Sequence, residues 1–363
     1  MKLKIAAFNV ENLFSRPKAM SLENHDVGAA KLRIIAELQD ALDEEAYDKP
    51  LIARLAGEAH GYFTINKTRG QNPLSYSRET KQYKVNVKGR GAWDGFVDLV
   101  REGFTFETVQ NTGALLRALD ADIVGLCEVE DSWALRRFRT DQLQDEKLRY
   151  DLVVDGNDPR RIDVALLSRF PYGCIHTHAH ETVTPASRER LFSRDCLEAQ
   201  IELGGGKRLS ILQNHFKSKL GAQGTSDKRR AAQALRVREI LDERYDLDKD
   251  LVIVCGDLND TPDSTPLQPL LSTRNLIDAL TLQDQGPDGG WTYYYGKEKA
   301  KNQIDYMLVS KALAELVTAS GVDRRGIAGI EALTDGRTTA LPGVTSWRNA
   351  ASDHGAVWIE VRL

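Results

Sequence analysis

Long apolar runs are absent from this sequence. A membrane-spanning helix needs about 20 consecutive apolar residues, and no segment approaches that length. At the start of the chain, residues 1–4 pass directly into the strand-like residues 5–10, without the apolar stretch and small-residue cleavage site of a secretion signal. We therefore expect a cytoplasmic protein that does not bind membranes.

Cysteine is also scarce. The four cysteines, Cys127, Cys174, Cys196 and Cys255, are far apart, and each lies in or beside an apolar segment of strand length. They show none of the spacings of a zinc site. We expect all four to be buried, unpaired side chains in a reducing compartment.

An excess of positive charge is missing too. The chain has 49 lysines and arginines against 53 aspartates and glutamates, a formal net charge of −4. This balance argues against a basic protein that coats nucleic acid, although it leaves room for a local basic groove. The 363 residues, 41% hydrophobic and 28% charged, are typical of a globular protein with a large core. Because we find no internal repeat and no low-complexity linker, we expect a single domain over residues 1–363, and a monomer.

Apolar segments of strand length recur along the chain, and several carry Val, Ile and Leu at consecutive positions, as strands covered on both faces do. We expect strands at residues 4–10, 122–127, 150–155, 163–168, 196–203, 208–215, 251–256, 303–309 and 356–361. Apolar residues at helical spacing predict amphipathic helices at residues 29–46, 105–119 and 227–245. This alternation predicts an α/β fold with sheets inside and helices outside.

Two stretches depart from the alternation. Residues 57–91 are polar and rich in turns, and their basic residues outnumber the acidic ones. The basic residues are Lys67, Arg69, Arg78, Lys81, Lys84, Lys88 and Arg90, with Tyr62, Phe63, Tyr76 and Tyr83 between them. Such an insertion is suited to bind phosphates and stack bases, and the alternative is a solvated excursion without a ligand. Residues 324–351, rich in Gly and Thr, predict a long loop that forms one wall of an active site.

Acidic, amide and histidine residues gather where the expected strands end or begin. They occur in five short runs, at residues 8–12, 127–131, 256–260, 304–306 and 352–354. If these runs converge, each close pair of carboxylates repels by about 4 kcal/mol at an effective dielectric constant of about 20. Protons or a divalent cation remove that repulsion. The pattern therefore predicts a metal site.

The run at residues 256–260 follows an apolar strand. Asp257 and Asn259 are two positions apart, so an extended backbone points both side chains to the same side. An ionised Asp257 is able to hold and deprotonate a water, and the amide of Asn259 is able to orient that water or a phosphate oxygen. The alternative is an Asx turn at a strand end.

Glu128 ends a second apolar strand in a carboxylate. Magnesium prefers a few hard oxygen ligands and completes its shell with water and substrate phosphate. Glu128 is therefore the first candidate for a metal ligand, with Glu130 and Asp131 as alternatives in the same run. Asn9 and Glu11 alternate on the first strand in the same way, and we expect Asn9 to bind phosphate and Glu11 to extend the metal shell. Read alone, this pair also fits an edge strand with a polar face.

Two histidines stand beside charged residues at strand ends. His354 follows Asp353, and Asp305 begins another strand, so either carboxylate is able to hold the histidine. A histidine held by a carboxylate has a fixed tautomer and a raised pKa. These properties suit a group that donates a hydrogen bond to an anionic phosphoryl centre. His215 ends a strand next to two cations that are able to neutralise phosphate charge, Lys217 and Lys219. Further phosphate-binding candidates, with a surface ion pair as the alternative for each, are Arg160, Arg161, Arg188, Arg190 and Arg194.

Taken together and in this order, the runs resemble the endonuclease/exonuclease/phosphatase superfamily, which includes DNase I-like nucleases, abasic-site endonucleases, inositol-phosphate phosphatases and sphingomyelinases. The resemblance extends from residue 8 to residue 358, apart from the two irregular stretches. It implies a four-layer α/β sandwich, in which two mixed β-sheets pack face to face with helices on the outside, and a metal-dependent site at one end. The stretch before Glu128 is longer than is usual in the family, so substrate preferences do not carry over.

The resemblance also implies a role for each site residue. Glu128 resembles the family's metal-binding Glu, and Glu11 and Asp353 resemble carboxylates at or beside the metal. The remaining roles concern the attacking water and the substrate. Asp257 and Asn259 flank the water, and Asp305 orients His354. The phosphoryl group is held by Asn9, His215 and His354, with Lys217, Lys219 and Arg161 as added phosphate ligands.

We therefore expect a Mg²⁺-dependent hydrolase, with Mn²⁺ as a substitute, in which water attacks a phosphate ester in line. Nucleic acid is the favoured substrate, because of the basic, tyrosine-bearing insertion and the Lys217–Lys219 pair. Inositol phosphates, sphingolipid or another small phosphoester are the main alternative, and a phosphate-binding protein without catalysis is the third. The sequence leaves open DNA or RNA, endo or exo cleavage, and one metal or two.

Overall fold

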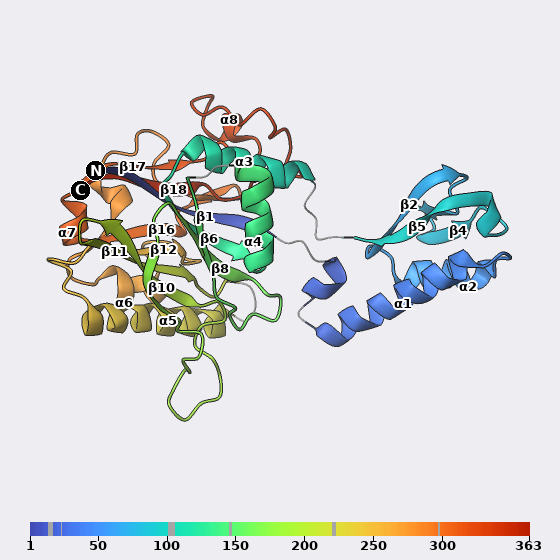
Figure 1. Cartoon of the computed structure of the whole chain (residues 1–363), viewed down its shortest axis with the longest axis horizontal. Coiled ribbons are helices and arrows are strands. Elements are labelled where there is room, and N and C mark those ends of the chain that lie inside the picture. The colour runs from blue at the N-terminus through green and yellow to red at the C-terminus, as the bar shows by residue number, and fades with distance from the viewer. Residues whose placement is uncertain (14–16, 23, 101–105, 145–146, 220–222, 297) are drawn as a thin grey trace. The chain divides into compact units, whose positions relative to one another are not determined.

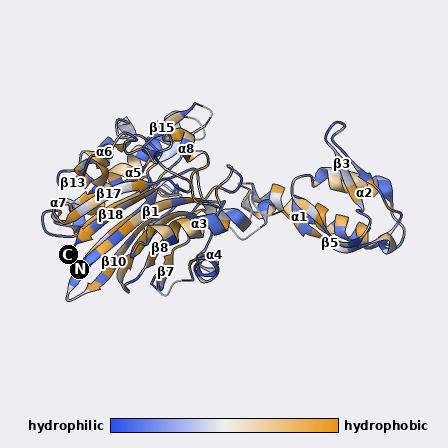
Figure 2. Ribbon diagram, turned by 90° about the horizontal axis from the view of Figure 1, so that it is seen from above, coloured by the Kyte–Doolittle hydropathy of each residue, from blue (hydrophilic) through white to orange (hydrophobic). Residues whose placement is uncertain are grey.

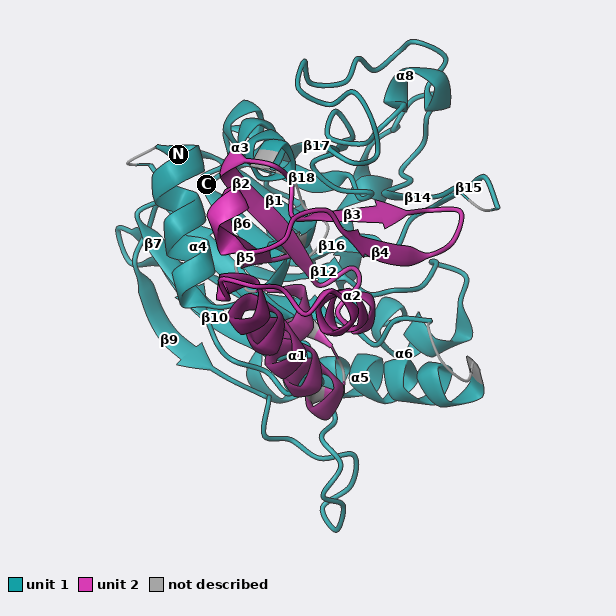
Figure 3. Cartoon of the chain, turned by 90° about the vertical axis from the view of Figure 1, so that its right-hand side faces the viewer, with its two compact units in different colours: residues 1–13, 104–363 teal, residues 14–103 magenta. Residues whose placement is uncertain are grey.

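A computed structural model describes the chain except for residues 14–16, 23, 101–105, 145–146, 220–222 and 297. Its internal contacts divide it into two compact units (Figure 3). Unit 1 comprises Met1–Leu13 and Phe104–Leu363, and unit 2 comprises Phe14–Gly103. Each unit has a hydrophobic core of its own, so the two are described separately.

Unit 1 is built on two six-stranded sheets. In spatial order, the first sheet contains β17 (Val317–Asp323), β18 (Ala356–Arg362), β1 (Lys2–Leu13), β6 (Ile123–Val129), β8 (Asp163–Ser168) and β7 (Tyr150–Val153). The second contains β13 (Leu276–Asp278), β16 (Asp305–Ser310), β12 (Val252–Asp257), β11 (Lys207–His215), β10 (Cys196–Gly204) and β9 (Tyr172–His176). Both sheets are mixed, because β1–β6 and β11–β12 are parallel pairs while their other neighbours are antiparallel.

Alternation along the strands forms the central core between the two sheets. On β1, Leu3, Ile5 and Ala7 belong to this core, whereas Phe8 and Val10 belong to a cluster on the outer face. Successive side chains of a strand point to opposite faces, which produces this division. Figure 2 shows the apolar residues of these strands in orange.

Helices cover the outer face of each sheet (Figure 1). α3 (Phe106–Leu119) and α4 (Ser132–Phe138) pack on the first sheet, and α5 (Gln223–Arg244) and α6 (Gln268–Leu271) pack on the second. The remaining elements of unit 1 are short: the helical turns η3 (Arg139–Leu143), η4 (Thr265–Leu267) and η5 (Ala279–Leu282), the helices α7 (Lys311–Ala314) and α8 (Ile330–Leu333), and the hairpin of β14 (Tyr293–Tyr295) and β15 (Ala300–Asn302). The predicted four-layer α/β sandwich is confirmed.

Unit 2 contains two helices and two antiparallel strand pairs. They are α1 (His25–Asp43), α2 (Lys49–Glu58), β2 (Phe63–Gly70) paired with β5 (Trp93–Leu99), and β3 (Leu74–Ser77) paired with β4 (Gln82–Val85), together with the turns η1 (Lys18–Ser21) and η2 (Arg90–Ala92). Leu38, Leu42, Ile52, Leu55 and Trp93 are among the residues of its core. The insertion is therefore larger and more regular than predicted: most of residues 57–91 lies in a helix end or in strands, not in irregular chain.

All nine predicted strands and three predicted helices are present, with ends displaced by a few residues; residue 105, the expected start of the second helix, lies outside the described residues. The strands of unit 2 and the edge strands β9, β13 and β17 were not predicted, because short or polar strands carry little periodicity. Cys174 corrects the cysteine prediction: it is exposed on the edge strand β9, while Cys127, Cys196 and Cys255 are buried, and all four are unpaired. Within the described residues, no helix is long and apolar enough to cross a membrane.

Candidate active site

Polar residues from both sheets meet at one end of the sandwich in unit 1. At this end, which we call the active-site edge, β1, β6, β11 and β12 finish and β16 and β18 begin. Asn9 connects the two sheets there: its Nδ2 donates to Asp257 Oδ2 of β12 at 3.1 Å and lies 3.5 Å from Glu128 Oε1 of β6. The predicted convergence of distant runs is therefore present.

Glu128 reaches this cluster only because its strand is irregular. Ile123 and Cys127 point into the central core and Val124 and Leu126 point outward, so regular alternation would place Glu128 on the outer face. Instead Glu128 has φ 69°, and the pairing of β6 with β8 shifts register between Cys127 and Val129. A bulge of this kind redirects a side chain, at a conformational cost of about 1–3 kcal/mol for a non-glycine residue.

Two other residues of the site also have a positive φ angle. Glu11 has φ 48°, where β1 shifts register against β6, and Asn259 has φ 57° just after β12. The Glu11 backbone N–H donates to Asn9 Oδ1 at 3.0 Å, and the Asn259 backbone N–H donates to Asp257 Oδ1 at 2.8 Å. Strained backbone conformations concentrated at one edge are typical of functional sites.

Three carboxylates form an acidic group at the active-site edge. Glu11 Oε2 accepts from the backbone N–H of Asp353 at 3.1 Å. Burial, followed by the negative charges of Asp353 and Glu128, raises the pKa of Glu11 to about 8. Burial likewise raises the pKa of Glu128. Carboxylates that resist ionisation for these reasons offer the hard oxygen donors that Mg²⁺ prefers, so the residues present fit a divalent cation.

His354 and Asp305 form a buried hydrogen-bonded pair. Asp305 Oδ2 lies 2.8 Å from His354 Nδ1 and accepts from Thr292 Oγ1 at 2.6 Å. Burial alone would lower the pKa of His354, but Asp305 and Asp353 outweigh it and raise the pKa well above its usual value. The imidazolium is thus a hydrogen-bond donor, and its Nε2 lies 3.6 Å from Asp353 Oδ1.

Donor atoms of Asp257, Asp305 and His354 lie within 4.8 Å of one another, which makes them a second possible metal-binding group within the described residues. A protonated histidine has no free lone pair for a metal, and His354 is already bonded to Asp305. The three residues are therefore better suited to proton and anion chemistry than to metal binding. The assignment of Glu128, Glu11 and Asp353 as metal ligands stays a prediction.

His215 lies beside the carboxylates of both sheets. Its Nε2 is 3.6 Å from Asp257 Oδ2 and 3.9 Å from Glu128 Oε1. Burial and the charge of Arg194 lower its pKa well below the usual value, so the ring is neutral. Its Nδ1 is buried without a hydrogen-bond partner among the described residues.

Asp257 has the environment of a base that works near neutral pH. Burial, followed by the charge of Asp305, raises its pKa to about 7. Proton transfer is most efficient when the pKa of the base is close to the working pH. The amide of Asn259 donates to Phe216 O at 3.1 Å, which fixes its orientation beside Asp257.

The predicted cationic residues are less clearly placed. Lys217 is half-buried beside His215, whose pKa its charge helps to lower. Lys219 Nζ instead pairs with Asp260 Oδ1 at 2.6 Å, and Arg161 is exposed with φ 50°. No contact in the described part of the chain joins Lys219 or Arg161 to Asn9, Glu128 or Asp257, so their phosphate-binding roles stay predictions.

Arg194 corrects the expectation of a surface ion pair. Only 2% of it is exposed, and its Nε lies 3.0 Å from Asp158 Oδ2. Its charge nevertheless lowers the pKa of His215 and opposes the rise in the pKa of Glu128, so it acts on the site. Spacing alone does not separate a buried arginine from an exposed one.

Sequence reasoning missed two residues that support His354. Thr292 Oγ1 donates to Asp305, and the ring of Tyr293 lies 4.8 Å from the His354 ring. The aromatic run at residues 291–295 was the available signal. The loop at residues 324–351, predicted to line the site, packs Ile327 and Ile330 against Trp291 of the same run.

Two tryptophans are unusually exposed in segments that leave or enter the active-site edge. Trp133 lies at the start of α4, five residues after Glu128, and Trp347 lies seven residues before His354; each is 77% exposed. The backbone next to Trp347 is fixed by Thr108 Oγ1, which donates to Arg348 O at 3.1 Å. Exposed aromatic rings on ordered segments are typical of binding surfaces.

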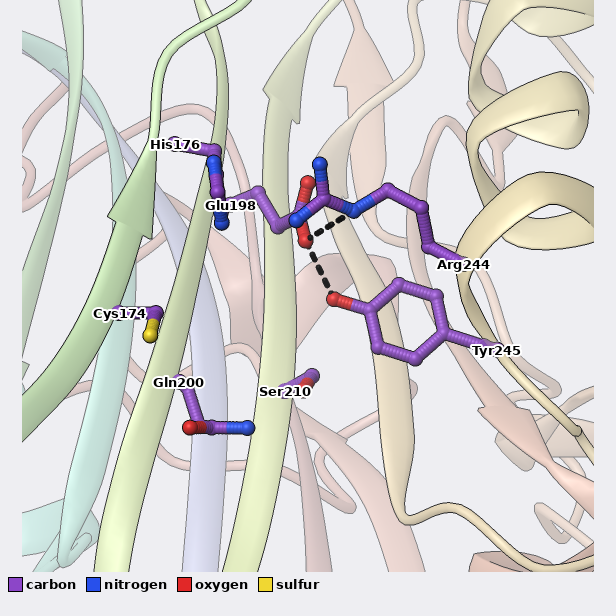
Figure 4. A pocket seen from close by; sticks show the side chains of 7 residues that line it. All are labelled: Cys174, His176, Glu198, Gln200, Ser210, Arg244 and Tyr245. Carbon is purple, nitrogen blue, oxygen red and sulfur yellow. Dashed lines mark hydrogen bonds and ion pairs between the residues drawn. The ribbon is translucent and has the colours of Figure 1, made fainter.

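A hollow of about 200 Å³ on the second sheet is separate from these residues (Figure 4). It is lined by Cys174, His176, Glu198, Gln200, Ser210, Arg244 and Tyr245. Glu198 Oε1 accepts from Tyr245 Oη at 2.5 Å and lies 3.1 Å from Arg244 Nε. None of the predicted site residues lines this hollow, and its charges are already paired with one another.

Comparison with known proteins identifies the family. The profile of the Endonuclease/Exonuclease/phosphatase family matches residues 102–354. The chain belongs to this family. Members of the superfamily are phosphoester hydrolases and are generally dependent on a divalent metal. The match begins at the end of unit 2, so Asn9 and Glu11 lie outside it, although β1 is central in the first sheet of the fold.

Solved structures support the fold. An endonuclease/exonuclease/phosphatase protein from Beutenbergia cavernae is 20% identical with a TM-score of 0.50, over 72% of this chain and 67% of that chain. D. rerio TDP2, solved with a single strand DNA product, is 13% identical with a TM-score of 0.50, over 71% of this chain and 92% of that chain. No curated protein sequence matches the chain significantly. Sequence identities this low support the fold alone.

Proposed function

We propose that this protein is a divalent-metal-dependent nuclease that hydrolyses phosphodiester bonds in nucleic acid by in-line attack of water. The observation that carries the proposal is the meeting of Asn9, Glu128 and Asp257 from two sheets at the active-site edge, with His215 and His354 beside them. This set combines a base, an acidic metal-binding group and neutral and cationic donors for phosphate oxygens. These are the elements that water attack on a phosphate ester requires.

Each residue of the set has a distinct role in the proposed reaction. Asp257 accepts the proton of the attacking water, and Asn259 keeps the base and the water aligned. Asn9 Nδ2, His215 Nε2 and the imidazolium of His354 donate to the phosphoryl oxygens, whose negative charge grows as the bond to water forms. Asp305 maintains the protonated, correctly oriented state of His354.

Glu128, with Glu11 and Asp353 beside it, is the group that would hold Mg²⁺ or Mn²⁺. A bound divalent ion supplies positive charge that stabilises the non-bridging and leaving oxygens. It would also offset the repulsion by Asp353 and Glu128 that, after burial, raises the pKa of Glu11.

Two features support nucleic acid as the substrate. Unit 2 exposes a basic segment, and the exposed rings of Trp133 and Trp347 offer surfaces on which bases stack. A protein of the same fold, D. rerio TDP2, is described with a single strand DNA product, so the fold is compatible with this substrate class.

The proposal is tested by incubating the purified protein with plasmid, single-stranded DNA, RNA, sphingomyelin and inositol phosphates, with Mg²⁺ or Mn²⁺ and with chelator. We expect cleavage of nucleic acid that requires the metal. Glu128→Gln should lose that activity and should also lose the rise in Tm that Mg²⁺ gives the wild-type protein, because a ligand stabilises only the state that binds it. Glu315→Gln, at an exposed position on the same unit, is the matched control.

Cleavage of sphingomyelin or inositol phosphates alone would overturn the nuclease assignment but retain a phosphoesterase. Full activity in chelator, or in Glu128→Gln, would overturn the metal-dependent mechanism.

A further inference from the structure

Charge is unevenly distributed along unit 2. Residues 37–48 contain six acidic residues and no basic one, whereas residues 60–93 contain seven lysines and arginines and one acid, Glu79. The near-neutral net charge of the whole chain therefore conceals a strongly basic segment. Such a segment is the electrostatic feature that attracts a polyanion.

The cations of this segment are available to a ligand. The set consists of Lys67, Arg69, Arg78, Lys81, Lys84 and Lys88, and every one is exposed. Within the residues that the structure describes, none of the six forms an ion pair, and the one hydrogen bond recorded from their side chains runs from Lys67 Nζ to Gly70 O. In contrast, Arg90 of the same segment is paired with Asp43 and Asp94.

The β3–β4 hairpin gives part of this set a fixed geometry. Leu74 and Val85 are buried and face each other across the hairpin, so Ser75 and Lys84, the adjacent cross-strand pair, occupy the opposite, solvent-facing side. Arg78 and Lys81 belong to the turn that joins the two strands. The hairpin thus presents three cations from a turn and one strand, on a backbone held by ladder hydrogen bonds.

An aromatic stack lies on the same hairpin. Tyr76 and Tyr83 are a cross-strand pair with ring centroids 4.9 Å apart, and the ring of His60 stacks on Tyr76 at 4.2 Å. His60 Nδ1 lies 3.0 Å from Tyr83 Oη, which holds the stack in place. Tyr76 is still 36% exposed although two rings contact it. By the same alternation Tyr76 and Tyr83 lie on the face of Leu74 and Val85, opposite Lys84. An ordered, partly exposed ring on a hairpin whose turn carries the unpaired cations Arg78 and Lys81 matches the way in which proteins bind single strands.

We infer that the β3–β4 hairpin of unit 2 binds single-stranded nucleic acid, with Arg78 and Lys81 of the turn on the phosphates and Tyr76 against a base. The inference rests on the proposed nuclease function, because binding at the hairpin would deliver the nuclease substrate. The binding itself does not require catalysis. Unit 2 joins the catalytic unit directly after Leu13, two positions beyond Glu11 on the same strand. A strand bound to the hairpin is therefore tethered to the enzyme, which raises its effective concentration.

The test measures binding of a fluorescent single-stranded oligonucleotide to the full chain, in chelator so that nothing is cleaved. The double variant Arg78→Glu, Lys81→Glu should weaken binding on the order of tenfold and reduce the slope of log K against log salt by about 1.4, since each phosphate contact contributes about 0.7 for a single strand. The control, Arg33→Glu with Lys207→Glu, makes the same change in net charge at exposed sites on α1 and at the start of β11. It should bind like the wild-type protein.

A second pair of variants tests the stacking contact. Tyr76→Ala should lose about 5- to 150-fold in affinity, the equivalent of losing one stacked base, while Tyr76→Phe should bind like the wild-type protein. Circular dichroism of each variant shows whether unit 2 has stayed folded. Hydrolysis of a small chromogenic phosphodiester, which is too short to reach a second site, should be the same in all the variants.

The outcomes separate this inference from the proposed function. Hairpin-dependent binding without cleavage of any nucleic acid would retain the inference and overturn the nuclease. Cleavage of nucleic acid, with equal affinities in the Arg78→Glu, Lys81→Glu protein and in its control, would overturn the inference alone. Hairpin-dependent binding to vesicles of anionic lipid, with no binding to the oligonucleotide, would also overturn it.

Discussion

At the scale of single residues, the site depends on carboxylates in environments that favour their neutral form. Asp257 and Glu11 have pKa values raised to about 7 and about 8, in each case first by burial and then by neighbouring negative charge. The two raised pKa values serve different roles in the proposed site. In the proposed mechanism Asp257 is the base that accepts a proton from the water, whereas Glu11, with Glu128 and Asp353, is the group that a cation would stabilise.

Replacing the proposed base tests the assignment of Asp257. Asp257→Asn retains the shape of the side chain but removes its proton-accepting oxygen, so we expect kcat on nucleic acid to fall by about 10²- to 10⁴-fold. Steady-state kinetics on an oligonucleotide measure the change. Asp263→Asn, at an exposed position in the loop after β12, should leave kcat unchanged. Near-native turnover in Asp257→Asn would remove Asp257 from the mechanism.

Trp133 provides a test of substrate contact at the same scale. Removing an exposed ring costs the folded protein little, so Trp133→Ala should leave stability and the hydrolysis of a small phosphodiester unchanged. If a base stacks on the ring, KM for an oligonucleotide should rise by about 5- to 150-fold. Trp133→Phe should lose less. An unchanged KM in Trp133→Ala would show that the ring lies outside the substrate path.

At the scale of elements, close contact between strands brings the site together. Gly256 has φ +116°, and an added Cβ would lie 2.0 Å from the backbone oxygen of Asn214 on β11. At Gly125 an added Cβ would lie 2.0 Å from Gln213 Oε1, which accepts from Cys255 Sγ at 3.0 Å. Gly256 directly precedes Asp257 on β12, and Gly125 lies three positions before Glu128 on β6.

These contacts predict an order of stability among three glycine variants. Gly256→Ala meets backbone and adopts a strained φ, so it should lower the free energy of unfolding by about 3 kcal/mol or more. Gly125→Ala meets the end of a side chain and should cost about 1–3 kcal/mol. Gly224→Ala, in open space on α5, should change stability by less than about 1 kcal/mol. Urea unfolding measures all three, and a Gly256→Ala protein as stable as Gly224→Ala would contradict the order.

A buried ion network joins β10 to α5. His178 Nδ1 lies 2.7 Å from Glu181 Oε1 and its Nε2 lies 3.1 Å from Glu198 Oε2, while Arg236 of α5 also pairs with Glu181. Burial would lower the pKa of His178, but hydrogen bonds to the two glutamates raise it to about 9. The hydrogen bond from His178 helps to lower the pKa of Glu181 to about 2, against the effect of burial.

The raised pKa of His178 predicts a pH dependence of stability. The folded state binds this proton more tightly than the unfolded state, so its contribution is complete below about pH 6.5 and is lost as the pH rises through about 9. Between these values, the stability advantage of wild type over His178→Gln should shrink by up to about 3 kcal/mol, since one pKa unit equals about 1.4 kcal/mol. Urea unfolding of both proteins at a series of pH values measures the difference. Subtracting the two curves cancels the carboxylates of the active site, and a constant difference would contradict the assignment.

At the scale of the whole molecule, unit 2 interrupts the catalytic fold between β1 and α3. Its core includes Leu38, Leu42 and Ile52, none of which belongs to the core clusters of unit 1. Separate cores allow a chain to unfold in separate steps.

A core substitution in unit 2 tests this separation. Leu42→Ala removes a fully buried side chain and should destabilise unit 2 by about 2–5 kcal/mol. We expect two transitions in urea, of which only one is displaced, with hydrolysis of a small phosphodiester unchanged below the first transition. Leu235→Ala, at an exposed position on α5, is the control. A single transition, displaced as a whole, would show that the two units unfold together.

The sequence alone determined the α/β class and nine strands of unit 1, and it predicted most residues of the candidate site. Buried strands are easy to recognise in a sequence, because both of their faces need apolar residues and these then follow one another along the chain. Polar residues at the strand ends mark where the chain leaves the core. Asp257, Asn259, Asp305 and His354 were predicted as site residues in this way, and the structure places them at the same edge of the sandwich. Their order along the chain also pointed to the correct family.

Only the tertiary structure decided which face each site residue occupies and which charges are paired. Glu128 would point away from the site in a regular strand, and it reaches Asn9 because a bulge changes the backbone there. Arg194 is buried against Asp158 and Lys219 is paired with Asp260, which no local pattern indicates. Bulges, burial and ion pairs depend on contacts between segments far apart in sequence, so periodicity within one segment does not determine them.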